Sequence, residues 1–379
     1  MCLFAAQAAL LVVSPILPEI AREFGVTTGT AAQLRSVSGI TAGGAALVLA
    51  TVRTRYALST LLNGGLVLLG FGSLLSAWSP GFGVLLVAQV VVGVGLAAVL
   101  SGGLAASDAW AEDGTSARVL SKALIGQPVA WIVGQPLVGL VAGGGWRWAF
   151  LAVPLGSVLL ALGAMVLRDR SISDGVPDSD PLGLWSQPGI RSWALSELLA
   201  YAAWAGTLVY AGALFIESYG LSVGATGVVL GLAAAFYLPG NSLGRRLLEK
   251  GILTLLTAFS IVAGILVIVF TAVRIDVVFT IIVFSTCVFF AAGRTIAGAA
   301  MGLQVSGGRR LAAMGIRTTL VQLGYLVGSG VGAVLLDRWG FAGIGWGFGA
   351  LFIAAGIVHL PKTVAGERLV PSAGLLRRG

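Results

Sequence analysis

The stretch RDRSISDGVPDSDPLGLWSQPGIR, residues 168–191, is a polar interruption in a chain that is otherwise largely apolar. It is rich in proline, serine, aspartate and glycine, a composition typical of a flexible linker. On each side of it the sequence carries six apolar runs long enough to cross a bilayer, since a spanning helix needs about 20 such residues. The stretch therefore divides the chain into two halves with the same number of predicted spans.

The predicted spans have similar lengths and are separated by short polar loops. In the first half they cover residues 3–20, 34–52, 57–77, 82–104, 121–143 and 147–167, and in the second half 193–216, 223–243, 252–272, 277–297, 312–336 and 341–360. We therefore predict an all-α integral membrane protein of twelve transmembrane helices. Its parts are an N-terminal six-helix bundle over 1–167, a linker over 168–191, a C-terminal six-helix bundle over 192–361 and a tail over 362–379.

The composition excludes most other classes of protein. The chain is 57% hydrophobic and 10% charged, whereas soluble domains carry about 25% charged residues. One histidine and two cysteines predict no haem, no metal site, no serine-histidine-aspartate triad and hence no enzyme or cofactor. The first run lacks the basic region and cleavage site of a signal peptide, so we interpret it as a span. It begins almost at Met1, which favours a short basic leader ahead of the printed sequence.

The positive charges are distributed unevenly between the two sets of loops. Eighteen of the 23 lysine and arginine residues fall on the side of the two termini and five on the other side. Because positive charge is retained in the cytoplasm, we predict a multi-pass protein of the cytoplasmic (inner) membrane with both termini in the cytoplasm. Topology thus explains the net charge of +8, and we expect no nucleic-acid partner.

Three landmarks of the first half recur in the second half at nearly one offset. Gly25 and Gly220 are 195 residues apart, Arg53 and Arg245 are 192 apart, and the glycine-rich segments that begin at 133 and 327 are 194 apart. This pattern indicates a duplicated six-span unit. Duplicated halves are typical of secondary transporters, in which the substrate site lies between the repeats near the middle of the membrane.

Several motifs, taken together with the twelve spans, resemble the major facilitator superfamily over the whole length of the chain. They are GWRWAF (145–150), QVVVGVG (89–95), the pair Asp108 and Arg118 after span four, the glycines that end in Gln135-Pro136, and RTTLVQLGYLVG (317–328). The resemblance is to the drug:proton antiporters and arabinose-efflux permeases of that superfamily. It implies a monomeric, alternating-access transporter that exports a small amphipathic organic molecule, such as a drug, sugar or metabolite, against a proton.

The chain departs from the pattern of these relatives at three places. The loop at 50–58 carries Arg53 and Arg55 but no acidic residue. Gln89 stands where antiporters have an arginine, and Gln135 stands where they have a glycine before proline. The last two departures weaken the case for the standard proton-antiport mechanism. The scarcity of carboxylates within the spans favours a second interpretation, in which the scaffold works as an uncoupled facilitator or lipid flippase.

Span five contains Gly-Gln-Pro twice, at 126–128 and 134–136. Proline bends a spanning helix and glycine lets a neighbour approach, so we expect this helix to pack and flex against its counterpart in the other half. The repeat offset of 194 residues predicts that this counterpart is span eleven, which contains Gly324, Gly328 and Gly332. The two glutamines either satisfy carbonyls freed by the prolines or face an aqueous cavity.

Charged residues inside the predicted spans need a reason, since burying one costs about 2.5–3.5 kcal/mol on insertion scales. Glu197, near the start of span seven, is a candidate proton-coupling site or ligand for a cation. Its alternative is an acid stabilised by nearby water and by the helix dipole in the first turns.

Two further sets of charges are candidates for gating. Asp108 could form a cytoplasmic latch with Arg53, Arg55 or Arg317, or could simply be a solvated loop acid. Arg35 and Glu19 could form a pair at the outer side, or both could extend to water.

Amide and aromatic side chains supply the remaining candidates for substrate binding, because ligand sites are mostly apolar with a few placed polar groups. They are Gln89, Gln127, Trp131, Gln135, Tyr201, Trp204, Gln322 and Tyr325. This set suits an amphipathic organic molecule. The alternative for the tryptophans is contact with lipid or simple packing.

Overall fold

The structure is a computed structural model that describes residues 1–51, 57–110, 116–167, 181–307 and 310–359. The described part of the chain is helical and contains no strand. The N-terminal bundle is formed by α1 (Cys2–Leu11), α2 (Val13–Phe24), α3 (Thr28–Thr51), α4 (Leu58–Ala77), α5 (Phe82–Ala109), α6 (Ser116–Ala142), α7 (Trp146–Phe150), the π-helix η1 (Leu151–Leu155) and α8 (Gly156–Val166).

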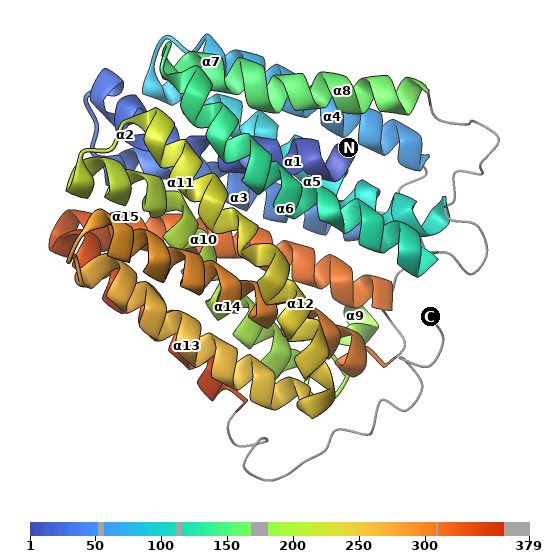
Figure 1. Ribbon diagram of the computed structural model, residues 1–379. Helices are drawn as coiled ribbons and strands as arrows, with labels where there is room; N and C mark the ends of the chain where they lie inside the picture. The colour runs from blue at the N-terminus through green and yellow to red at the C-terminus, as the bar shows by residue number, and fades with distance from the viewer. Residues whose placement is uncertain (52–56, 111–115, 168–180, 308–309, 360–379) are drawn as a thin grey trace.

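The C-terminal bundle follows the short helix α9 (Pro181–Leu184). It is formed by α10 (Ile190–Tyr219), α11 (Val223–Ala235), α12 (Tyr237–Leu247), the 3₁₀ turn η2 (Leu248–Lys250), α13 (Ile252–Ala272), α14 (Val277–Val305) and α15 (Arg310–Ile357). Figure 1 shows the two bundles one above the other, with the blue and green helices in the upper one and the yellow to red helices in the lower one.

Twelve crossings can be traced through the described residues. Ten segments are long and apolar enough to cross a membrane, and one of them, Ala312–Ile357, is 46 residues long. A break at Gly340 (φ 62°, ψ −161°) divides that segment into two crossings. Helix α3 is less apolar because it carries Arg35 and several hydroxyl side chains, but its 24 residues are long enough to provide the remaining crossing. The predicted all-α membrane fold of twelve helices is therefore confirmed.

The outer surface of the helices is apolar, as contact with lipid requires. Large apolar side chains stand exposed on many helices, among them Val67, Leu159, Leu232 and Val278. Without a membrane such a surface would aggregate. The lipid bilayer therefore covers it.

The segment predicted as a flexible linker is partly packed. Residues 168–180 lie outside the described part of the chain. Beyond them, Pro181–Leu184 forms α9, and Leu184 is fully buried against the C-terminal bundle beside Ile190 and Trp193. Apolar side chains within this Pro- and Gly-rich stretch therefore pack on the C-terminal bundle.

The alternating helices place the described loops at two ends of the molecule. We call one the Gly25 end, with the turns at Gly25, Trp78, Gly145, Gly220 and Gly340, and the opposite one the Met1 end. In Figure 1 the Gly25 end is on the left, near the labels α2 and α7, and the bundles diverge towards the right.

At the Gly25 end, the motif GWRWAF joins helices of the N-terminal bundle through an ion pair and hydrogen bonds. Arg147 forms an ion pair with Glu23, donates to the carbonyl oxygen of Ser79 at 3.0 Å, and lies over the ring of Trp146. The indole nitrogen of Trp146 also donates to Glu23. The motif thus ties the end of α2 to the start of α7 and to the turn before α5.

The glycines and prolines of α6 meet a different partner from the one expected. Helix α6 continues through Pro128 and Pro136 as one helix and packs on α11 rather than on span eleven. A Cβ on Gly231 would lie 2.5 Å from Cγ of Pro136. Span eleven, the first part of α15, packs instead on α3. The offset of the repeat relates equivalent helices, but equivalent helices need not touch.

The two bundles touch each other towards the Gly25 end. Ser14 of α2 donates to the carbonyl oxygen of Leu208 in α10 at 2.6 Å, and these positions are 194 residues apart, the same offset as the sequence repeat. Ser36 of α3 and Ser329 of α15 hydrogen-bond at 2.7 Å. These contacts hold the bundles together at this end.

Candidate functional site

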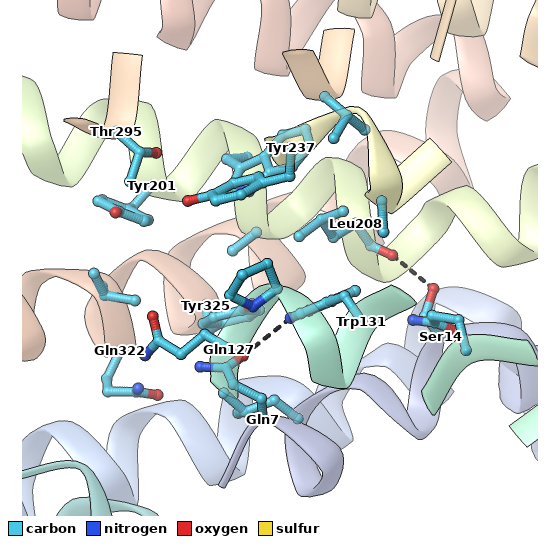
Figure 2. Close-up of a pocket in the computed structure, with 18 of the residues that line it drawn as sticks. Gln7, Ser14, Gln127, Trp131, Tyr201, Leu208, Tyr237, Thr295, Gln322 and Tyr325 are labelled. Atoms are coloured by element: carbon cyan, nitrogen blue, oxygen red, sulfur yellow. Dashed lines mark hydrogen bonds between the residues drawn. The ribbon is translucent and has the colours of Figure 1, made fainter. Parts of the chain in front are cut away.

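A cavity of about 190 Å³ lies between the two bundles and is lined by side chains from both. Ser14 and Leu208, whose hydrogen bond joins the bundles, stand at its Gly25 side. Figure 2 shows this bond at one side of the cavity and a group of polar side chains at the other, with Gln7, Gln127 and Gln322 facing Tyr201 and Thr295.

The structure brings together seven of the eight residues that the sequence nominated for substrate binding. The cavity is lined by Gln127, Trp131, Gln135, Tyr201, Trp204, Gln322 and Tyr325. The tryptophans among them face the cavity instead of lipid. The eighth residue, Gln89, lies elsewhere: it is buried between α4 and α5, and its amide nitrogen donates to Oγ of Ser76 at 3.1 Å.

Hydrogen bonds hold in place two of the polar side chains that the N-terminal bundle contributes to the cavity. The indole nitrogen of Trp131 donates to Oε1 of Gln7 at 3.0 Å. The amide nitrogen of Gln135 donates to the carbonyl oxygen of Leu11 at 3.4 Å, so this glutamine satisfies a backbone carbonyl of α1 as well as lining the cavity. Gln127 forms no hydrogen bond to a described residue and faces the cavity.

Beside the cavity, Glu197 binds two arginines. Its Oε1 accepts from Arg294 at 2.5 Å and its Oε2 accepts from Nε of Arg317 at 2.9 Å. The glutamate is fully buried, Arg294 is 2% exposed and Arg317 is 17% exposed. Arg294 also donates to both oxygens of Ser196.

This arrangement differs from the alternative interpretation of Glu197, in which nearby water and the helix dipole stabilise it, while its role in proton coupling stays a prediction. The residue lies seven positions into α10, about 10 Å along the helix, and is enclosed by protein rather than water. Arg294, near the end of the predicted span 277–297, is one of the eighteen cations counted on the side of the termini, but α14 continues to Val305 and buries it. The predicted span ended at 297, which placed the arginine too close to the membrane surface.

Arg35 lies within the interface between the bundles and is not near the outer surface. It is 1% exposed, its guanidinium lies 4.4 Å from the ring centroid of Tyr325, and its Nη1 donates to Ser38 at 2.9 Å. It forms no ion pair with Glu19, although both residues are described. The packing of α15 on α3 covers the arginine, so the expectation of an outer pair or of an extended, hydrated side chain is wrong for Arg35.

The predicted latch cannot be followed in the structure. Arg53 and Arg55 lie outside the described residues, as does the side chain of Asp108, which belongs to the last turn of α5. The remaining partner proposed for it, Arg317, binds Glu197. The latch stays a prediction.

Sequence reasoning missed several polar residues of the cavity, including Gln7, Tyr237, Thr295 and Thr318. The repeat carried a signal for one of them, because an offset of 194 leads from Tyr201 back to Gln7. The same offset leads from Tyr325 to Trp131. Within the described ranges no three His, Cys, Asp or Glu side chains gather at one point, so no candidate metal ligands can be named there.

The chain is similar in sequence to two bacterial proteins. It is 24% identical over 371 residues to the protein of Pseudomonas aeruginosa called transcription regulatory protein OpdE, covering 95% of this chain and 91% of that protein. It is 27% identical over 157 residues to the MFS-type transporter YbcL of Bacillus subtilis, which covers 41% of this chain and 39% of the relative.

Solved structures show the same fold. A bacterial homologue of the human lysosomal transporter Spinster, in an inward-facing and occupied conformation, superposes with a TM-score of 0.77 at 15% identity, covering 98% of this chain and 97% of that chain. A D-xylose–proton symporter superposes with a TM-score of 0.71 at 15% identity, with the same coverage.

The family itself is established by a sequence match. Residues 1–293 match the family model described as Major Facilitator Superfamily. This region contains the whole N-terminal bundle and much of the C-terminal one. With two six-helix bundles around a shared cavity, the chain belongs to the major facilitator superfamily of membrane transporters.

Proposed function

We propose that the protein exports a small amphipathic organic molecule from the cytoplasm by alternating access. The single observation that carries the proposal is the cavity between the bundles, lined by both and bounded by Ser14 and Leu208 at the Gly25 side. A site shared by two rigid bodies changes its exposure when they rock against each other. The mixture of aromatic, aliphatic and amide groups around it suits an organic molecule rather than a bare ion.

The orientation follows from the distribution of positive charge. We place the Met1 end and both termini in the cytoplasm of a bacterial cell, because most lysines and arginines of the sequence fall on that side. The contacts between the bundles at Ser14 and Ser36 then lie on the outer side of the cavity, which supports access to it from the cytoplasm in this conformation. We further propose that the two bundles, joined by residues 168–191, work together as one functional monomer.

The coupling of transport to protons through Glu197 stays a prediction, and one observation favours the uncoupled alternative. Both oxygens of the carboxylate are bound by arginines. Protonation would leave two guanidinium groups without a counter-charge in a protein interior. A facilitator on the same scaffold needs no titrating carboxylate.

Export is tested by exposing a bacterial host to a panel of toxic anionic, neutral and cationic amphiphiles, with and without expression of the protein. We expect expression to lower the cellular content of at least one compound. Loss of this difference after addition of an uncoupler supports energisation by the proton-motive force, whereas a facilitator should speed equilibration of the compound without lowering its final content in the cell. The absence of any difference across the panel contradicts export.

A disulfide across the bundle interface is expected to stop transport. Ser36→Cys and Ser329→Cys place two thiols where the hydroxyl oxygens are 2.7 Å apart, in a background with Cys2→Ser and Cys287→Ala. Oxidation should link α3 to α15, hold the Gly25 end closed and abolish the difference in accumulation, and a reductant should restore it. Each single-cysteine variant serves as the control and should transport under both conditions. Full transport by the oxidised, cross-linked protein would contradict a rocking motion.

A further inference from the structure

The charges around the cavity do not balance. Among the described residues that line it, the one with a charged side chain is Arg317. Glu197 lies behind it and is shared with Arg294, so two cations and one anion form the cluster and leave an excess charge of one positive. An uncompensated charge in the membrane interior is costly. The cluster therefore favours a negatively charged occupant of the cavity.

Arg317 has a donor group available for that occupant. Its Nε is used by Glu197, and its Nη2 donates to the hydroxyl of Tyr201 at 2.6 Å and to the carbonyl oxygen of Thr295 at 3.2 Å. Its Nη1 makes no hydrogen bond to any described residue. These bonds also hold the guanidinium in place at the wall of the cavity, which reduces the cost of ordering it when a ligand binds.

Neutral donors lie on the same side of the cavity as Arg317. Figure 2 shows Gln127 and Gln322 near each other and facing Tyr201, the hydroxyl partner of Arg317. The amide nitrogens of Gln127 and Gln322 donate to no described residue. A guanidinium with adjacent amide donors is a favourable environment for a carboxylate or similar anionic group.

The other part of the cavity is mostly apolar, although Ser14 and Gln135 also line it there. Leu208, Leu230, Phe284 and Val288 line it, and each lies closer to the Gly25 end along its helix than Tyr201 or Thr295 does. The cavity therefore has a positively charged portion towards the Met1 end and a mostly apolar portion towards the Gly25 end. Its volume of about 190 Å³ exceeds the roughly 150 Å³ of an apolar cavity that holds benzene.

We infer that the transported molecule is an amphipathic organic anion of about the size of one ring with a short chain, whose acidic group pairs with Arg317. The inference rests on the proposed function, which supplies the cavity's role. It goes further by naming the sign of the charge and the direction of the molecule, with its acid towards the Met1 end and its apolar body towards Leu208 and Phe284.

Three probes with one body and different head groups test the inference. They are 4-phenylbutyrate, 4-phenylbutan-1-ol and 4-phenylbutylamine, titrated by calorimetry into the full-length protein in nanodiscs, with empty nanodiscs subtracted. We expect the carboxylate to bind at least ten-fold more tightly than the alcohol, and the amine most weakly. Equal or reversed affinities, or no binding of the carboxylate, overturn the inference.

Variants of Arg317 test whether the preference for the carboxylate arises in the cavity. Arg317→Gln should lower the affinity for 4-phenylbutyrate at least ten-fold, to that of the alcohol, whereas Arg317→Lys should retain part of the preference because it retains the charge. Arg274→Gln is the matched control, since Arg274 is an exposed cation at the Gly25 end that donates to Thr271 and Ser218. The order of the affinities of the three probes for the wild-type protein tests the inference even where a variant fails to fold.

Flux measurements separate this inference from the proposed function. Binding of the carboxylate with the expected order but without its movement across proteoliposome membranes contradicts transport and leaves the anionic site in place. Movement of the amine or alcohol, but not of the carboxylate, contradicts the anionic substrate and leaves transport in place.

Discussion

Replacing Glu197 by glutamine is expected to lower the free energy of unfolding by about 3–5 kcal/mol, the usual effect of removing one partner from a buried ion pair. The glutamate is fully buried and is the shared counter-charge of Arg294 and Arg317. Its loss leaves two cations close together in an apolar interior. Unfolding in mixed micelles, followed by loss of helical circular dichroism as a denaturing detergent is added, measures the change.

Two comparisons make this result specific. Glu23→Gln removes the same charge from a pair whose side chains are 35% and 41% exposed, and should change stability by less than about 1 kcal/mol. The double variant Glu197→Gln with Arg294→Met removes one of the stranded cations and should be more stable than Glu197→Gln alone. If Glu197→Gln and Glu23→Gln lowered the free energy of unfolding equally, burial of the cluster would not make the loss of its carboxylate more destabilising.

Gly227→Ala is expected to shift the protein away from the conformation that is closed at the Gly25 end. The added Cβ would lie 2.5 Å from the carbonyl oxygen of Gln135 and 2.8 Å from Cα of Gly139, and neither backbone atom can yield unless α6 and α11 separate. Overpacking of this kind costs about 1–3 kcal/mol. Since each 1.4 kcal/mol is about ten-fold in a population ratio, the closed state should lose roughly five- to 150-fold against its alternative.

Distances between spin labels at the Gly25 end measure this shift. Trp78→Cys and Ile275→Cys place labels on two exposed positions of different bundles, each 69% exposed, in a background without the native cysteines. The variant should move the main distance to longer values. Gly64→Ala is the control, because a Cβ there meets no atom within 4 Å. An unchanged distance distribution in Gly227→Ala would contradict the packing of α6 on α11 as the closing contact.

The sequence was sufficient to predict the helices because lipid imposes a length and an apolar composition on every crossing. It was less informative about the interior of the helices. The break at Phe236 between α11 and α12 lies close to Pro239 and the π-helix at Leu151–Leu155 contains Pro154, but hydropathy alone does not register these prolines. It also failed to pair α6 with α11, since hydropathy gives the length of a helix and not the identity of its neighbour.

The candidate site was predicted better for amide and aromatic residues than for charges. A polar side chain within a spanning helix needs a polar partner or an aqueous cavity. The position of Gln127, Gln322 and Tyr201 within a span was therefore enough to predict them as site residues. Arginines, in contrast, were interpreted by the side of the membrane to which they were assigned. Arg294 and Arg35 could not be recognised as buried, because their burial depends on contacts with Glu197 and Tyr325 that are distant in sequence.

We propose that one cavity is exposed in turn to the two sides of the membrane. The most direct measurement of this exposure is the labelling of Gln127→Cys, in the background without native cysteines, by a membrane-impermeant maleimide added to vesicles of either orientation. Gln127 lines the cavity. We expect labelling from the side of the termini in this background, and labelling from the opposite side once Gly227→Ala is added. Labelling from the same single side in both backgrounds would contradict the proposal.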